Sequence, residues 1–270
     1  MHRVEPKPYL VGESALDDIE IQRFLKEAYG PIGQQWFVNN CMEEVDELVA
    51  SDSEILAEVM GRLCYRSFAA GLNKNVTKIR EGNDEYIGNL LKQKHGSVLE
   101  HGSTNWIIHN VSRVFTHELV RHRAGVAVSQ ESMRYVRLDD FGLWLPEDPA
   151  ITEEIRLMCE KKFIEDEKFC TALGHALRID AAGNDFAYKK KWTSFIRRFA
   201  PHGLATTIGF TINFRAMRHV IEMRTSEGAE VEIRLVFDMI ARICKEKYPA
   251  IMQDMEPNEK GEWLPKNSKV

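Results

Sequence analysis

Three arginines and a histidine are concentrated in the run RHRAGVAVSQESMRY, which spans residues 121–135. A predicted helix gives way here to an irregular segment. Arginine presents a planar fork of donors that matches phosphate oxygens, and free backbone N–H groups in a loop can complete an anion site. The segment therefore predicts a phosphate or pyrophosphate site. A solvated basic helix end, favoured by the helix dipole, explains the bare composition equally well.

Three further segments carry polar side chains that could serve the same site. Two histidines bracket glycine, serine and glutamate in HGSVLEH, residues 95–101. An Arg-Arg pair at 197–198 precedes Pro201, although such a pair alone is more often a solvated patch. Polar residues also recur within the apolar run 208–223 and just after it. Buried polar side chains need partners, so a bound ligand is one candidate partner there.

The hexapeptide HELVRH, residues 117–122, resembles the zinc-binding helix of metallohydrolases. That motif needs histidines at i and i+4, so that both imidazoles reach one metal. His117 and His122 are separated by five residues, which places them roughly 140° apart around a helix. A metal-dependent hydrolase remains the alternative enzyme class, but no metal is expected. Neither G-x-G-x-x-G nor G-x-x-x-x-G-K-[ST] occurs, so the common nucleotide-binding folds are unsupported.

The elements that must position these residues are predicted from periodicity and capping. We expect helices over 41–60, over 84–95 with Gly96 as its cap, after Ser112, from Thr152 through Cys170, over 203–223 and over 229–247. A short strand is expected over 102–111, because the segment is rich in β-formers. Residues 124–137 are expected to form a loop. No internal repeat is present, so a single α+β domain is predicted.

Composition limits the class of protein. Of the 270 residues, 44% are hydrophobic and 29% are charged, and the net charge is −5. This is ordinary for a soluble globular protein and argues weakly against nucleic-acid binding. No apolar run is long enough to span a membrane. The five cysteines form no C-x-x-C pair, and the N-terminus lacks a secretion signal, so a reduced cytoplasmic setting is expected.

Taken together, the four segments resemble the motifs of flavin-dependent thymidylate synthases. The family signature is Arg-His-Arg, seven or eight residues, then Ser-x-Arg-Tyr, and this chain has RHR, eight residues and SMRY. HGSVLEH is similar to the upstream His-x-Ser/Thr-x-x-Glu-His. Downstream, Arg197, Pro201, Asn213, Arg215 and Arg224 match in identity and order. The resemblance covers roughly residues 55–250.

The resemblance implies a reaction and its cofactors. The uracil of dUMP is methylated at C5 and reduced to give dTMP, with 5,10-methylenetetrahydrofolate as carbon donor and FAD, reduced by NADPH, as hydride carrier. It also implies an α+β fold with a central mixed or antiparallel sheet flanked by helices, in a homotetramer with sites at the subunit interfaces. The corresponding division is an extension over 1–50, the family domain over 51–255 and a tail over 256–270.

The resemblance also implies roles for individual residues. The FAD-contacting positions are Ser97, Arg121, His122, Arg123, Gln130, Asn213, Arg215 and His219. The dUMP-contacting positions are Glu118, Arg121, Gln130, Glu131, Ser132, Met133, Arg134, Arg197 and Arg224. Arg224 and His95 are the catalytic positions: Arg224 meets the uracil N3–O2 edge, and His95 lies beside the flavin ring. Arg134 and Arg197 are the natural phosphate partners, and Ser132 positions substrate rather than attacking it.

Two residues depart from the family pattern. Glu118 stands where glutamine is common, so its carboxylate would repel a phosphate unless it faces a sugar hydroxyl or an arginine. His219 stands where asparagine is common. A third class of function, an RNA-binding module built on Arg121–Arg123, is disfavoured by the negative net charge and by the lack of nearby aromatic platforms.

Overall fold

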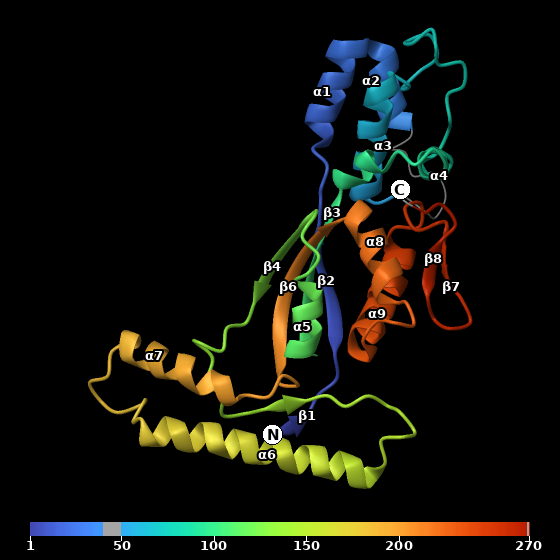
Figure 1. Ribbon diagram of the computed structural model, residues 1–270. Coiled ribbons are helices and arrows are strands. Elements are labelled where there is room, and N and C mark those ends of the chain that lie inside the picture. Colours follow the sequence, from blue (N-terminus) through green and yellow to red (C-terminus); the bar gives the residue numbers. More distant parts are fainter. Residues whose placement is uncertain (40–49, 269) are drawn as a thin grey trace.

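A computed structural model describes residues 1–39, 50–268 and 270, and Figure 1 shows a sheet at the centre of the chain. The sheet has four strands in the order β2-β3-β6-β4. Each neighbouring pair is antiparallel. The strands are β2 (Lys7–Glu13), β3 (Ser103–Ser112), β4 (Val126–Gln130) and β6 (Ala205–Asn213). The predicted α+β class is confirmed, and the central sheet is antiparallel.

The strand β6 occupies the first half of a segment that the sequence predicts to be helical. Buried and half-buried positions alternate along ATTIGFTIN, which is the pattern of a strand with one face in the core. Ile208, Phe210 and Ile212 point into that core, each at most 1% exposed. The helical prediction over 203–223 is therefore wrong up to residue 213 and confirmed beyond it, where α8 (Phe214–Arg224) begins.

The segment 124–137 is only partly the predicted loop. Val126–Gln130 forms β4, which pairs with β6 at the edge of the sheet. Its residues are half-buried or exposed, so the strand lacks the apolar alternation that marks a buried strand. Backbone pairing with β6 holds it in place instead.

Helices cover one face of the sheet and share its main core (Figure 1). α5 (Arg113–Leu119), α8 and α9 (Val231–Lys247) pack against the strands. α3 (Asp52–Tyr65), α4 (Asn83–Lys92) and the 3-10 helix η2 (Gly96–Glu100) lie beyond the upper end of the sheet and extend the same core there. The short hairpin of β7 (Met255–Pro257) and β8 (Trp263–Pro265) packs beside α8. The caps predicted at Ser112 and Thr152 are confirmed, because their side chains accept from Phe115 N and Ile155 N. The Gly96 cap is wrong, because the helix ends at Lys92 with Gln93 as its C-cap, and Lys94 has positive φ.

The N-terminal residues contribute to two places in the fold. The strand β2 forms one edge of the central sheet. Beyond it, α1 (Asp18–Tyr29) and α2 (Pro31–Phe37) pack on α3 around buried Trp36, Phe37 and Phe68. The helix predicted over 41–60 is confirmed from Asp52, after the Ser51 capping box. Its first part, 41–49, lies outside the described residues.

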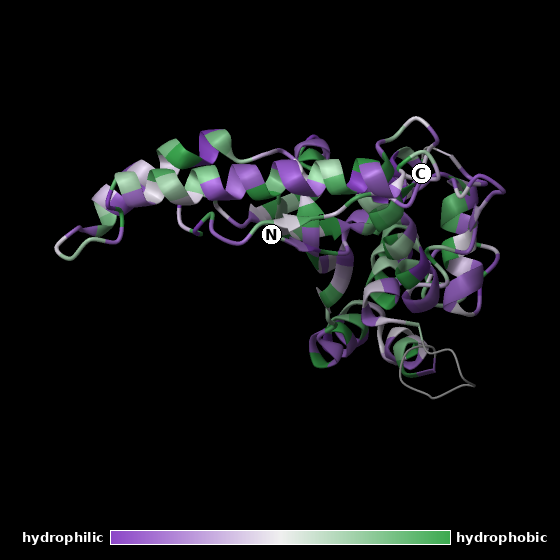
Figure 2. Cartoon of the chain, turned by 90° about the horizontal axis from the view of Figure 1, so that it is seen from below, coloured by the Kyte–Doolittle hydropathy of each residue, from purple (hydrophilic) through white to green (hydrophobic). Residues whose placement is uncertain are grey.

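A helical arm extends from the lower end of the sheet (Figure 1). It consists of α6 (Glu153–Ala176), α7 (Phe186–Ile196) and the 3-10 helix η3 (Arg197–Phe199), beside the paired β1 (His2–Arg3) and β5 (Gly142–Leu143). Hydrophobic residues are interspersed with hydrophilic ones along the arm (Figure 2). Several are exposed, including Leu157 at 55%, Met158 at 66% and Phe186 at 67%. Although α6 has 24 residues, none of the described helices is long and apolar enough to cross a membrane.

Candidate active site

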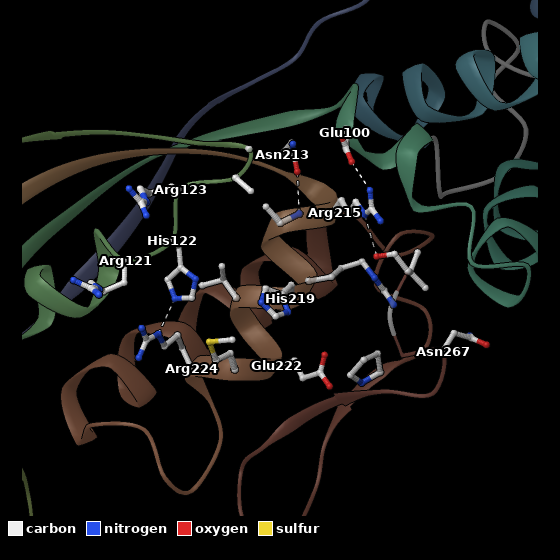
Figure 3. Close-up of a pocket in the computed structure, with 18 residues that line it drawn as sticks. Glu100, Arg121, His122, Arg123, Asn213, Arg215, His219, Glu222, Arg224 and Asn267 are labelled. Carbon is white, nitrogen blue, oxygen red and sulfur yellow. Dashed lines mark hydrogen bonds and ion pairs between the residues drawn. The ribbon is translucent and has the colours of Figure 1, made fainter.

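A cavity of about 690 Å³ lies between α8, the turn after α5 and the C-terminal segment. Figure 3 shows the turn on one side and the polar face of α8 beside it. Seven of the residues predicted to form the site line the cavity: Arg121, His122, Arg123, Asn213, Arg215, His219 and Arg224. The turn and one face of α8 therefore bring the Arg-His-Arg and Asn-x-Arg motifs together, although about ninety positions separate them in the chain.

The turn is built by the end of α5. The amides of Arg121 and His122 donate to the carbonyls of Glu118 and Leu119 at 3.2 and 3.1 Å, which tightens the last helical turn. Gly125 follows with φ of +68°, and its carbonyl accepts from Asn213 N at 3.0 Å. A Cβ at Gly125 would lie 2.3 Å from Asn213 Nδ2. Only glycine fits here, because the turn approaches the start of α8 so closely.

The N-terminus of α8 is fixed by Asn213. Its Oδ1 accepts from Ala216 N at 2.9 Å, as an N-cap does. Two residues later, Arg215 Nη1 donates to Glu100 Oε1 at 2.5 Å, which ties α8 to η2 across the cavity rim (Figure 3). His219 follows one helical turn further and also faces the cavity.

Arg224 lies at the other end of α8 and is held by three acceptors. Its Nη1 donates to Glu118 Oε2 at 2.5 Å, its Nη2 to the Glu118 carbonyl at 3.1 Å, and its Nε to His122 Nε2 at 2.8 Å. Burial lowers the pKa of His122 to about 4, with further contributions from the charges of Arg224 and His219. His122 is therefore a neutral imidazole at pH 7, and its Nε2 can accept a hydrogen bond.

A second group of predicted residues continues from β4 toward the arm. Gln130 Nε2 donates to Thr116 Oγ1 at 2.9 Å, and Glu131 Oε2 accepts from Thr207 N at 3.2 Å. Arg134 donates through its backbone N to Ser132 Oγ and through Nε to Ser194 Oγ of α7.

Two other members of this group lie with the arm. Met133 packs on the arm's apolar cluster, and Arg197 begins η3. Burial lowers the pKa of the neighbouring Arg113, and the positive charge of Arg197 lowers it further. None of the six residues Gln130–Arg134 and Arg197 is among the described residues that line the cavity.

His95 and Ser97 lie beside the cavity rather than on its wall. The His95 ring stacks on Tyr65 at 5.8 Å between centroids, and Tyr65 Oη lies 3.3 Å from His95 Nδ1. Between them in sequence, Gly96 lies against Arg215, since a Cβ there would be 2.9 Å from Nε. η2 therefore brings the histidine motif close to the rim formed by Arg215.

Comparison with known proteins decides the family. A model described as thymidylate synthase complementing protein matches residues 47–250. An enzyme from Corynebacterium diphtheriae, named flavin-dependent thymidylate synthase, is 33% identical over 230 residues, covering 84% of this chain and 85% of that one. The chain belongs to the flavin-dependent thymidylate synthase family. A member from Mycobacterium avium is 34% identical over 211 residues, covering 77% and 81%.

The fold has a solved counterpart. A UMP/dUMP methylase from Streptomyces cacaoi, solved bound with 5-Br UMP, covers 92% of both chains with a TM-score of 0.59 at 14% sequence identity. At that identity the likeness concerns the fold alone.

Some residues that line the cavity were not predicted. Glu222 lies on α8 three residues after His219, so the helical spacing that found His219 could have found it. Glu100 could have been found in the histidine motif itself. Asn267 comes from the C-terminal segment, where no sequence signal points to the cavity.

The two histidines of HELVRH face different neighbours. His122 accepts from Arg224, whereas His117 packs edge-on against His202 with centroids 5.4 Å apart. The hexapeptide therefore does not direct two imidazoles at one point, as a zinc helix would. Within the described part of the chain, no group of three or more His, Cys, Asp or Glu side chains is arranged to hold a metal ion.

Proposed function

We propose that this chain is a flavin-dependent thymidylate synthase that methylates dUMP at C5 and reduces it to dTMP. FAD would be its cofactor, 5,10-methylenetetrahydrofolate the carbon donor and NADPH the reductant. The observation that carries the proposal is the convergence of four of the family's arginines, with a neutral histidine, on one cavity: Arg121, Arg123, Arg215 and Arg224. The relatives' shared name supplies the chemistry, and the cavity supplies a place for it.

The cavity suits FAD in size and in charge. A volume of about 690 Å³ falls within the usual range for cofactor sites. Arg215 and Arg224 are paired with Glu100 and Glu118. Among the residues that the structure describes, Arg121 and Arg123 have no carboxylate at ion-pair distance, so both can meet a diphosphate. Asn213, Arg215, His122 and His219 would complete the FAD contacts, and Ser97 and Gln130 would extend them.

The nucleotide is proposed to bind between copies of the chain. β4 leads away from the cavity, because it begins at Val126, directly after Gly125 of the cavity wall. Gln130, at the other end of β4, is four residues further along the extended strand, a span of roughly 13 Å. The phosphate partners Arg134 and Arg197 lie further toward the arm. A homotetramer would bring Gln130–Arg134 and Arg197 of one copy to the cavity of another. The exposed hydrophobic residues of the nearby arm support such an assembly.

Each side chain then has a role that its chemistry supports. Arg224 would donate to the uracil N3–O2 edge, which favours loss of the N3 proton and raises electron density at C5. Ser132 would position the nucleotide. His95 would lie beside the flavin ring, where folate or nicotinamide approaches. The flavin, when bound, supplies hydride transfer, and the protein supplies binding, orientation and electrostatics.

The domain boundaries and the setting are also proposed. The family domain would span 51–255, close to the matched range of 47–250. Residues 1–50 would be an extension that adds an edge strand and two helices, and 256–270 a tail that closes one side of the cavity. The enzyme is proposed to act in the cytoplasm on small molecules, without a nucleic-acid or membrane partner.

The absorption spectrum of the purified protein tests the proposal. We expect flavin absorbance at about 450 nm, which should disappear when NADPH reduces the flavin. We also expect dTMP formation that requires dUMP, methylenetetrahydrofolate and NADPH together. Omitting each of the three in turn is the control. A colourless protein that cannot be reconstituted with FAD, or a yellow protein that converts no dUMP, would refute it.

A further inference from the structure

The guanidinium of Arg224 is engaged mainly by one residue of α5. Glu118 accepts from Nη1 through its carboxylate and from Nη2 through its own backbone carbonyl, and His122 accepts from Nε. A guanidinium carries five N–H donors. Three are therefore occupied, and two remain, one on each terminal nitrogen. Arg224 is held in one orientation, with its free donors available to a ligand in the cavity.

The support beneath Glu118 is rigid. Phe115 and Leu119 lie about 60° and 100° around α5 from Glu118, and both are fully buried in the main core. The helix starts at the Ser112 cap, whose backbone N donates to the buried Glu232 at 2.7 Å. A short helix fixed at its start and along its inner face keeps Glu118 in place. The position of Arg224 is therefore fixed by contacts that lead to the core through Glu118 and α5.

The pair also changes the charge that a ligand meets. The Arg224 and Glu118 side chains are 14% and 33% exposed, so water screens them only partly. A carboxylate at 2.5 Å from Nη1 offsets most of the positive charge that Arg224 presents. Arg121 and Arg123, in contrast, line the same cavity without such a carboxylate among the described residues. The cavity thus contains unpaired cations at the turn and a neutralised donor pair at Arg224.

We propose that Glu118 is a positioning residue that acts through Arg224. Its carboxylate and its backbone carbonyl hold the guanidinium in one orientation, so that one N–H on each terminal nitrogen stays free for the uracil edge of the nucleotide. The inference rests on the proposed function, because it assigns the uracil edge to Arg224 and the phosphates to unpaired arginines. Glu118 itself need not touch the nucleotide.

A double-mutant cycle in dUMP binding tests this on the flavin-loaded protein. Glu118→Ala should weaken dUMP binding about tenfold or more, the scale of a lost charged hydrogen bond. Glu118→Gln should stay within about threefold of the parent, because the amide oxygen still accepts from Nη1. In an Arg224→Gln background, Glu118→Ala should have no further effect. Glu227→Gln is the matched control, since this exposed carboxylate pairs with Lys260 and lies outside the cavity lining.

Two results of the cycle would overturn the proposal. If Glu118→Ala still weakens binding in the Arg224→Gln background, Glu118 contacts the nucleotide directly. If Glu118→Gln loses as much affinity as Glu118→Ala, the charge rather than the positioning matters.

The titration of His122, followed by NMR, provides a readout that does not depend on dUMP. His122 is faced by Arg224 and His219 of α8 and flanked by Arg121, Arg123 and Glu118 of its own segment, with Glu222 on the same cavity wall. Removing a nearby carboxylate alone would lower the pKa of His122 further below about 4. Releasing Arg224 from His122 would raise it.

We expect Glu118→Ala to raise the pKa of His122, because it releases Arg224. Glu118→Gln keeps Arg224 in place and removes only the negative charge, so it should leave the pKa of His122 at or below the parent's value. An unchanged or lower pKa in Glu118→Ala would overturn the positioning role. Failure of the parent protein to bind dUMP would instead refute the proposed function, and the His122 titration would still decide the role of Glu118.

Discussion

Gly125 is the point at which the fold and the cavity are most tightly joined, and Gly125→Ala should damage both. The left-handed backbone, with φ of +68°, costs an alanine about 1–2 kcal/mol. The new Cβ would lie 2.3 Å from Asn213 Nδ2 and 2.7 Å from its Cγ, so the Asn213 side chain must move. Losing its cap on α8 costs about 1 kcal/mol more. The free energy of unfolding should fall by roughly 2–3 kcal/mol.

Urea unfolding and flavin content measure the two effects of Gly125→Ala. A loss of this size lowers Tm by roughly 5–10 °C in a chain of this length and leaves the protein folded. Flavin content should drop, because the start of α8 carries Asn213 and Arg215 into the cavity. Gly228→Ala is the control, since a Cβ there meets nothing within 4 Å. If Gly125→Ala equals the parent in both stability and flavin content, the close approach does not constrain the site.

Three further changes probe the reaction, the core and the pH response. Arg224→Ala should cost on the order of 2–4 kcal/mol in the transition state, about 30- to 1000-fold in dTMP formation, and near-normal turnover would contradict its role. Arg218→Ala should lower the free energy of unfolding in urea by about 3–5 kcal/mol, because it leaves the buried Asp254 without its ion-pair partner; a cost below about 1 kcal/mol would argue against a working pair. Burial raises the pKa of Glu232, and hydrogen bonds from Ser112 oppose this in part. There is therefore a pH range in which the Glu232 carboxyl is protonated in the folded protein and ionised in the unfolded chain. The stability that protonation of Glu232 contributes is present at low pH and is lost as pH rises through the folded-state pKa. Tm of Glu232→Gln relative to the parent should therefore rise between pH 4 and 7. Parallel curves of Tm against pH for the two proteins would show that ionisation of Glu232 is not linked to stability.

Local signals predicted the elements that depend on local chemistry. Ser112 and Thr152 were identified as helix caps because a cap bonds to a backbone amide three residues away. α9 followed from its apolar spacing. The strand β6 was missed because it passes into α8 at Asn213 with no turn residue between them. The edge strand β4 was missed because its pairing with β6 joins residues about eighty positions apart, which no local pattern records.

In the site, too, features set by local sequence were predicted, whereas contacts between distant residues were not. The Arg121–Arg123 run and the Asn213, Arg215 and Arg224 spacing converge on one cavity, because each motif is compact and its element orients it as a unit. The Glu118–Arg224 pair joins side chains 106 residues apart, so the sequence could show only that a carboxylate there needs a sugar hydroxyl or an arginine as its partner. The separation of Gln130–Arg134 from the cavity follows from the direction of β4, which the predicted loop left open.

Both strands that lead to the cavity enter their helices without a loop: β3 ends at Ser112 where α5 begins, and β6 ends at Asn213 where α8 begins. A single residue inserted or deleted in either strand would exchange the strand's two faces beyond that point, and one inserted or deleted at the start of either helix would turn the rest of that helix by about 100°. Chain length at these two junctions is therefore fixed by geometry. The connection between α6 and α7, residues 177–185, has no such constraint, and we expect family members to differ in length there rather than at the strand–helix junctions.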